Sequence, residues 1–63
     1  MDKIAALLTK QLDEKISLLQ NSLSDGRAKD YAEYQRGVGE IRGLLTARQY
    51  ITVLNNKMET YDE

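Results

Sequence analysis

Large apolar residues recur every three or four positions along the first part of the chain. They stand at Ile4, Leu8, Leu12, Ile16, Leu19 and Leu23. Spacings of four, four, four, three and four place these residues on one face of an α-helix, with Leu7 and Leu18 beside that face. Asp2 has the side chain of a helix N-cap, and its charge suits the positive end of a helix. The pattern predicts a helix over about 2–23.

A short polar segment then interrupts the apolar pattern. Ser24, Asp25 and Gly26 are typical of a helix end, because Gly26 adopts the left-handed backbone conformation without steric cost. Short connections usually join antiparallel helices. The segment therefore predicts a turn over about 24–28 and a second helix over about 29–61. Either Asp30, with Glu33 three residues later, or Asp25 is expected to cap that helix.

The second predicted helix has an apolar stripe that changes direction partway along. Its large residues stand at Tyr31, Tyr34, Val38, Ile41, Leu44, Leu45, Ile51, Leu54, Met58 and Tyr61. The spacings alternate mainly between three and four, but the phase slips at Leu44 and Leu45, so the stripe rotates round the helix there. Together the two segments predict one all-α domain, residues 1–63, folded as an antiparallel two-helix hairpin with a longer second helix. Self-association of this hairpin is left open.

The two predicted helices differ in length. At 1.5 Å per residue, the first spans roughly 33 Å and the second roughly 50 Å. Folded back on itself, the first helix is expected to cover the second only to about Tyr50. The apolar residues beyond that point then have no cover within the chain, and clustered exposed apolar residues usually mark an interface. The residues predicted to bind a protein partner are Tyr50, Ile51, Leu54, Met58 and Tyr61.

Three glycines, Gly37, Gly39 and Gly43, lie inside the predicted second helix. Each costs a helix roughly 1 kcal/mol relative to Ala, so a compensating interaction is expected. Gly39, Gly43 and Ala47 follow one another at four-residue intervals, and such a stripe of small residues permits close helix packing. The packing partner is either the first helix or a second molecule. Alternatively, the glycines bend or break the second helix between 37 and 43, or they make a direct functional contact.

The composition excludes several classes of function. The chain has no Cys and no His, which removes disulfides, the usual zinc frameworks and the commonest general base. Glu33 and Glu40 lie seven residues apart, but Arg36 between them is typical of a salt-bridged, solvated face. We therefore expect no enzymatic activity, no catalytic residues, no metal and no cofactor.

The charge and hydropathy of the chain bear on its partners and its location. Nine basic and ten acidic residues give a net charge of -1, which disfavours nucleic acid as a partner. The longest apolar run, residues 4–8, is far shorter than the ~20 residues of a membrane span, and no signal-peptide core is apparent. A protein partner or a homo-oligomer remains, in the cytoplasm and without membrane contact.

Two segments of the chain resemble short proteins of tailed bacteriophages. These segments are residues 23–34, LSDGRAKDYAEY, and residues 39–44, GEIRGL. The similar proteins are uncharacterised helical hairpins encoded among head-morphogenesis genes, and they have an acidic C-terminal end that is weaker here. The resemblance implies a bacteriophage accessory or virion-associated protein that acts by helix-mediated binding, for example to a phage structural protein. It would be located in the host bacterial cytoplasm or in the virion.

An alternative function belongs to another class. A small phage protein of this kind could directly bind a bacterial anti-phage defence protein and trigger or inhibit it. The same exposed apolar surface would serve both functions, so the sequence does not separate them.

Overall fold

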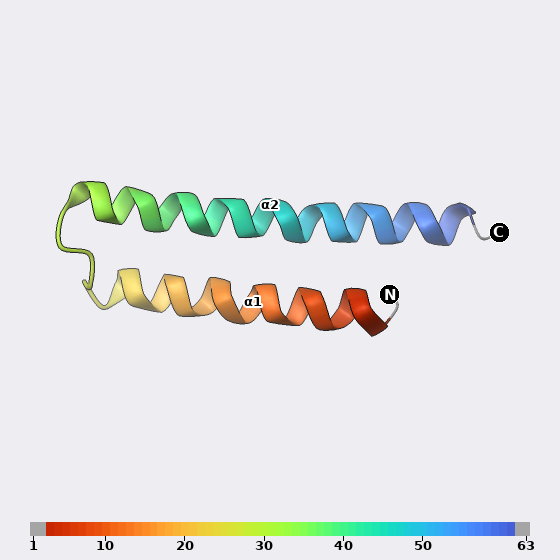
Figure 1. Cartoon of the computed structure of the whole chain (residues 1–63), viewed down its shortest axis with the longest axis horizontal. Helices are drawn as coiled ribbons and strands as arrows, with labels where there is room; N and C mark the ends of the chain where they lie inside the picture. Colours follow the sequence, from red (N-terminus) through yellow and green to blue (C-terminus); the bar gives the residue numbers. More distant parts are fainter. Residues whose placement is uncertain (1–2, 62–63) are drawn as a thin grey trace.

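The chain folds into two long α-helices that run antiparallel, as Figure 1 shows. The computed structural model describes residues 3–61, with side chains described up to residue 58. Helix α1 spans Lys3–Ser24 and helix α2 spans Tyr31–Tyr61. The hairpin measures 51 × 17 × 12 Å. The prediction of an all-α hairpin with a longer second helix is confirmed. Asp2, the expected cap of the first helix, lies outside the described residues.

Helix α1 ends in a hydrogen-bonded turn built around Gly26. The Gly26 N–H donates to the Leu23 carbonyl at 3.1 Å, and the Arg27 N–H donates to the Ser22 carbonyl at 3.2 Å. This pair of bonds is the Schellman arrangement, which satisfies carbonyls that the end of a helix leaves free. It requires a left-handed residue, and Gly26 has a φ of 73°. The predicted role of Gly26 is confirmed.

Helix α2 begins with a cap on Asp30. The Glu33 N–H donates to Asp30 Oδ1 at 2.8 Å, and the Glu33 carboxylate accepts a bond of 3.2 Å from the Lys29 N–H. The side chains of Asp30 and Glu33 thus each satisfy a backbone donor near the first turn, as in a capping box. Of the two residues that the sequence offered, Asp30 is the cap. Asp25 belongs to the end of α1, where its N–H donates to the Asn21 carbonyl at 2.9 Å.

The two helices meet along one stripe of partly or fully buried positions on each helix. On α1 these positions are Ala5, Thr9, Leu12, Ile16, Leu19 and Leu23, and on α2 they are Gly37, Ile41, Leu44, Arg48, Ile51 and Asn55. Both stripes have spacings of four, three, four, three and four. This alternation averages 3.5 residues and is the repeat of a coiled coil. The hairpin is therefore a short antiparallel coiled coil.

Two contacts fix the register of the pair. A methyl group added at Gly37 would come within 3.0 Å of Leu23 Cδ2, and Arg48 Nη1 lies 2.6 Å from Asp13 Oδ1. The residue numbers in each pair add up to 60 or 61. Because both helices rise by the same distance per residue and run in opposite directions, any two residues that lie level with each other have about this total. The layers therefore change from Leu and Ile near the connection to Ala5 opposite Asn55 at the other end.

The apolar core lies in the half of the hairpin near the connection. Ile16, at 5% exposure, is the one buried side chain among the described residues. The apolar stripe predicted for the first helix does not follow the contact at its start, because Ile4 is 79% exposed and Leu8 is also exposed. Four-residue steps overshoot a full turn by about 40° each. The two four-residue steps before Leu12, from Ile4 to Leu8 and from Leu8 to Leu12, place Ile4 and Leu8 off the contact face, which instead passes through Ala5 and Thr9.

The extent of coverage also differs from the expectation. The register places Thr9 level with Ile51 and Ala5 level with Asn55, so α1 flanks α2 to about Asn55 and not only to Tyr50. Helix α2 starts later than predicted, and its first turns lie beside the connection and not beside α1. Each residue of α1 therefore pairs with a residue farther along α2 than expected. Helix α2 still extends past the N-terminal end of α1 (Figure 1).

Candidate protein-binding surface

Three of the predicted binding residues are exposed on one side of α2. Tyr50 is 65% exposed, and Leu54 and Met58 are each 61% exposed. They follow one another at four-residue intervals, so each lies about one turn beyond the last and the three form a continuous ridge. The structure therefore brings together three of the five residues that the sequence singled out.

The other two predicted residues differ from these three. Ile51 is half-buried at a position in the contact stripe, level with Thr9 of α1. Its side chain contributes to the contact between the helices and not to the exposed ridge. The side chain of Tyr61 lies outside the described residues.

Helix α1 adds exposed apolar surface from the residues at the start of its predicted apolar stripe. Ile4 and Leu8 are exposed and one turn apart, with the exposed Leu7 between them. The register places them level with residues 52–56 of α2, beside Leu54. The sequence signal for this exposure was the unbroken four-residue spacing of Ile4, Leu8 and Leu12, because residues of a contact stripe are separated by three and four positions in alternation.

These α1 residues lie on the same flank of the hairpin as Leu54 and Met58. A crevice near the connection, formed by both helices, includes Ser22, Arg36 and Glu40 in its lining. Eighteen residues make about five complete turns. Ile4 is eighteen residues before Ser22, Leu54 is eighteen after Arg36, and Met58 is eighteen after Glu40. Ile4, Leu54 and Met58 therefore lie on the flank of the hairpin that carries the crevice.

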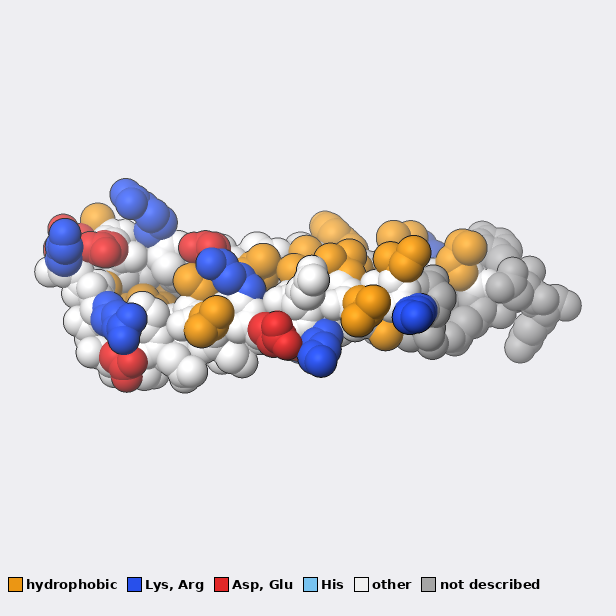
Figure 2. Space-filling model, turned by 60° about the horizontal axis from the view of Figure 1, so that its bottom comes forward, with side chains coloured by type: hydrophobic (Ala, Val, Ile, Leu, Met, Phe, Trp, Pro, Cys, Tyr) orange, Lys and Arg blue, Asp and Glu red, His pale blue; other side chains and the backbone are white. Residues whose placement is uncertain are grey.

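We call this surface the open-end patch, and it consists of Ile4, Leu8, Tyr50, Leu54 and Met58. It lies at the end of the hairpin away from the connection. Figure 2 shows hydrophobic side chains gathered toward that end, while Lys, Arg, Asp and Glu side chains are frequent around the connection. The patch itself contains no charged residue. An exposed apolar surface of this kind, built by both helices, is typical of a protein interface.

The opposite flank of α2 carries a smaller apolar surface near the connection. Leu45 and Leu54 are nine residues apart, which is about two and a half turns, so they point to opposite sides of the continuous helix. Tyr34, Val38 and Leu45 share the first of these sides, and the rings of Tyr31 and Tyr34 lie 6.5 Å apart. The change of direction expected near Leu44 therefore divides the apolar residues of α2 between two flanks.

The glycines do not pack in the expected way against α1. A methyl group added at Gly39 or Gly43 would meet nothing within 4 Å, whereas one added at Gly37 would meet Leu23. Gly39 and Gly43 are exposed and Ala47 is half-buried. Packing of this small-residue stripe on α1 is therefore ruled out at both glycines, because they face away from the contact stripe. Its packing on a second molecule remains a prediction. Helix α2 runs without a break through 37–43.

One ion pair joins the two helices. Arg48 occupies a core position of the coiled coil, level with Leu12, and its guanidinium donates to the Asp13 carboxylate at 2.6 Å. Both side chains are nearly half exposed, at 43% and 47%. A charged residue at such a position fixes register more than it adds stability. The pair lies between the apolar core and the open-end patch.

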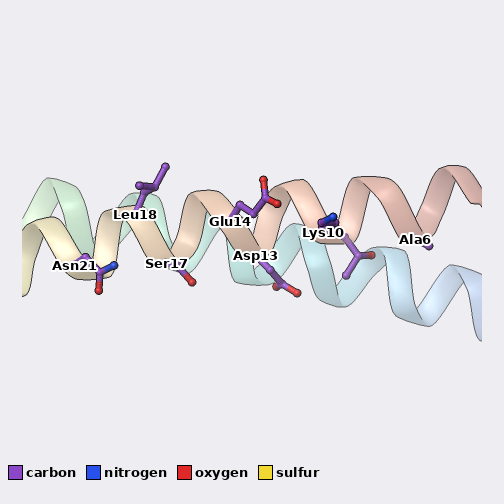
Figure 3. Close-up of a pocket in the computed structure, with 8 residues that line it drawn as sticks. Ala6, Lys10, Asp13, Glu14, Ser17, Leu18 and Asn21 are labelled. Atoms are coloured by element: carbon purple, nitrogen blue, oxygen red, sulfur yellow. The ribbon is translucent and has the colours of Figure 1, made fainter.

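A depression lies on the surface of α1. Figure 3 shows a depression lined by Ala6, Thr9, Lys10, Asp13, Glu14, Ser17, Leu18 and Asn21, all of them from α1. A surface formed by a single helix does not enclose a ligand. In the described part of the chain, no group of His, Cys, Asp and Glu side chains is placed to hold a metal ion. No helix within it has the length and apolarity needed to cross a membrane.

Comparison with known proteins gives no relative: no family model, no curated protein and no solved structure matches the chain.

Proposed function

We propose that this chain is a non-enzymatic accessory or virion-associated protein of a tailed bacteriophage that acts by helix-mediated binding of protein. Its binding surface is the open-end patch. The observation that carries the proposal is the contrast between one buried side chain, Ile16, and the large exposed side chains of the patch. Monomeric soluble proteins rarely expose contiguous apolar patches of more than a few hundred Å². A contact with another protein is the ordinary way to cover such a surface.

The phage setting has a separate support. It rests on the resemblance of residues 23–34 and 39–44 to short phage proteins. Those segments lie at the connection and in the first half of α2, away from the open-end patch. The binding surface and the biological setting are therefore independent parts of the proposal, and each needs its own test.

Particles of a phage that encodes the chain provide the test of the setting. We expect the protein in purified particles or in assembly intermediates, and we expect the double variant Leu54→Asp/Met58→Asp to be lost from them. The matched control is Leu18→Asp, because Leu18 is 66% exposed on α1 but lies outside the patch. Absence of the wild-type protein from both particles and intermediates would sink the virion-associated function.

The same variants test the alternative function. If the protein is absent from particles but a single host protein is captured from uninfected bacterial lysate, binding to a defence protein becomes the better explanation. That capture must be lost in Leu54→Asp/Met58→Asp and kept in Leu18→Asp. Capture that is equal for all three proteins would place the binding surface elsewhere.

A further inference from the structure

The area of the open-end patch is suited to pairing with a second copy of the chain. Its five residues together expose on the order of 600 Å², if each presents about 200 Å² when fully exposed, which is the size of a large aromatic residue. A stable interface covers about 800 Å² on each partner, of which a little more than half is apolar. The patch therefore supplies the apolar area of a standard interface, and the polar residues around it supply the remainder.

The chemistry of the patch permits it to face itself. Lys57 is the one charged residue in the sequence between 49 and 58. It lies three residues after Leu54 and seven after Tyr50, so it borders the patch on the side of α2 that points away from α1. Two patches can therefore meet with Lys57 at the rim, where its long side chain keeps the ammonium group in water and no charge is buried that would oppose association.

The hairpin alone buries little apolar surface. A domain of this size is marginally stable and usually depends on disulfides, a metal or association. The chain has no Cys, and the described residues hold no candidate metal site. The layers nearest the open end, Thr9 with Ile51 and Ala5 with Asn55, contribute little apolar packing. Association at this end would stabilise the weakest part of the coiled coil.

We propose that two copies pair through their open-end patches about a two-fold axis that passes near Leu54. The two connections then point away from each other. A parallel arrangement along the whole flank would bury Arg36 and Glu40 of both copies, whereas overlap of the open ends leaves these residues in water. This inference rests on the proposed function, because it names a second copy of the chain as the occupant of the same patch.

Sedimentation equilibrium of the full chain over a range of micromolar concentrations tests the pairing. The expected result is a reversible transition from 7.2 kDa to twice that mass. Leu54→Asp/Met58→Asp should raise the dissociation constant at least about a hundredfold, because it places two carboxylates from each copy at the centre of an apolar contact. Leu18→Asp should leave the dissociation constant within about threefold, as expected for a residue outside the interface. A wild-type monomer at every concentration overturns the inference but leaves binding to a different protein intact.

A cysteine variant keeps the test decisive if the double variant loses its helical structure. Because the chain has no Cys, Leu54→Cys introduces a single thiol, and the two-fold axis brings the two copies of it together. Oxidation should link Leu54→Cys into a dimer much faster than it links Leu18→Cys. Equal rates for the two variants, or a dimer that persists unchanged in Leu54→Asp/Met58→Asp, would overturn the placement of the interface.

Discussion

The three glycines of α2 offer a test of which surfaces are packed. Replacing a helical Gly by Ala stabilises a helix by about 1 kcal/mol, since Ala lacks the conformational freedom that Gly loses on folding. The gain is realised only where the added methyl group has room. Gly39 and Gly43 have nothing within 4 Å of that methyl group, whereas at Gly37 it would lie 3.0 Å from Leu23 Cδ2.

The expected changes in unfolding free energy follow from this geometry. Gly39→Ala and Gly43→Ala should each stabilise the hairpin by about 1 kcal/mol, which raises Tm by roughly 4–8 °C for a domain of this size. At Gly37, the Leu23 side chain has to move aside, and an off-rotamer side chain costs about 0.5–1.5 kcal/mol. The helix gain and this cost nearly cancel, so Gly37→Ala should change stability little.

Thermal unfolding followed by circular dichroism measures all three variants under identical conditions. The order of Tm values should be Gly43→Ala and Gly39→Ala above wild type, with Gly37→Ala close to wild type. The reasoning is refuted if Gly43→Ala lowers Tm. Such a loss would mean that a second molecule packs closely on the small-residue stripe and that the stripe, with Ala47, forms an interface.

Four further substitutions test the fold. Ile16→Ala should lower the free energy of unfolding by about 2–5 kcal/mol and leave the chain largely unfolded. Ile4→Ala, measured at concentrations where the chain is monomeric, should change it by no more than about 0.5 kcal/mol. Similar losses for the two variants in urea titrations would contradict the assigned core. Asp30→Ala should lower stability by about 1 kcal/mol through loss of the cap, and an unchanged Tm would show that the cap is dispensable. Arg48→Leu should raise the urea midpoint by an amount equivalent to about 1 kcal/mol, because its exposed ion pair is worth at most that much and Leu can pack opposite Leu12; a lower midpoint would show that the ion pair is worth more.

The sequence was sufficient to predict the hairpin because its two strongest local signals agree. The apolar repeat from Leu12 to Leu23 predicts a helix, and Gly26 ends it with the left-handed conformation that the structure contains. The cap on Asp30 was one of two alternatives, and only the hydrogen bond from the Glu33 N–H decides between them. Local chemistry therefore defined the elements, and their ends to within a few residues.

The face of each residue was harder to predict, because it depends on how the second helix is aligned. Ile4 and Leu8 continue the apolar pattern of α1, yet the contact passes through Ala5 and Thr9. The register that decides this is set by Leu23 against Gly37 and by the ion pair of Arg48. Neither contact is apparent from the spacing within a single helix.

Part of the exposed patch was predicted from the sequence, but the structure gives a different reason for the exposure of Leu54. Leu54 and Met58 were expected to be exposed because α1 would end before reaching them. The register shows instead that α1 lies level with Leu54, which is exposed because it lies on a flank. The sequence does not identify the partner, because an apolar patch has no charge pattern or ligand chemistry that is specific to one occupant.

Methyl NMR spectra recorded during association test the central claim most directly. The claim is that the open-end patch, and not the rest of the hairpin surface, makes the protein contact. With selectively labelled Ile, Leu, Val and Met methyl groups, the signals of Ile4, Leu8, Leu54 and Met58 should shift as the protein concentration rises or as a partner is added. Signals of Val38 and Leu45, on the opposite flank, should stay in place. Shifts confined to Val38 and Leu45, with the patch unchanged, would contradict the account.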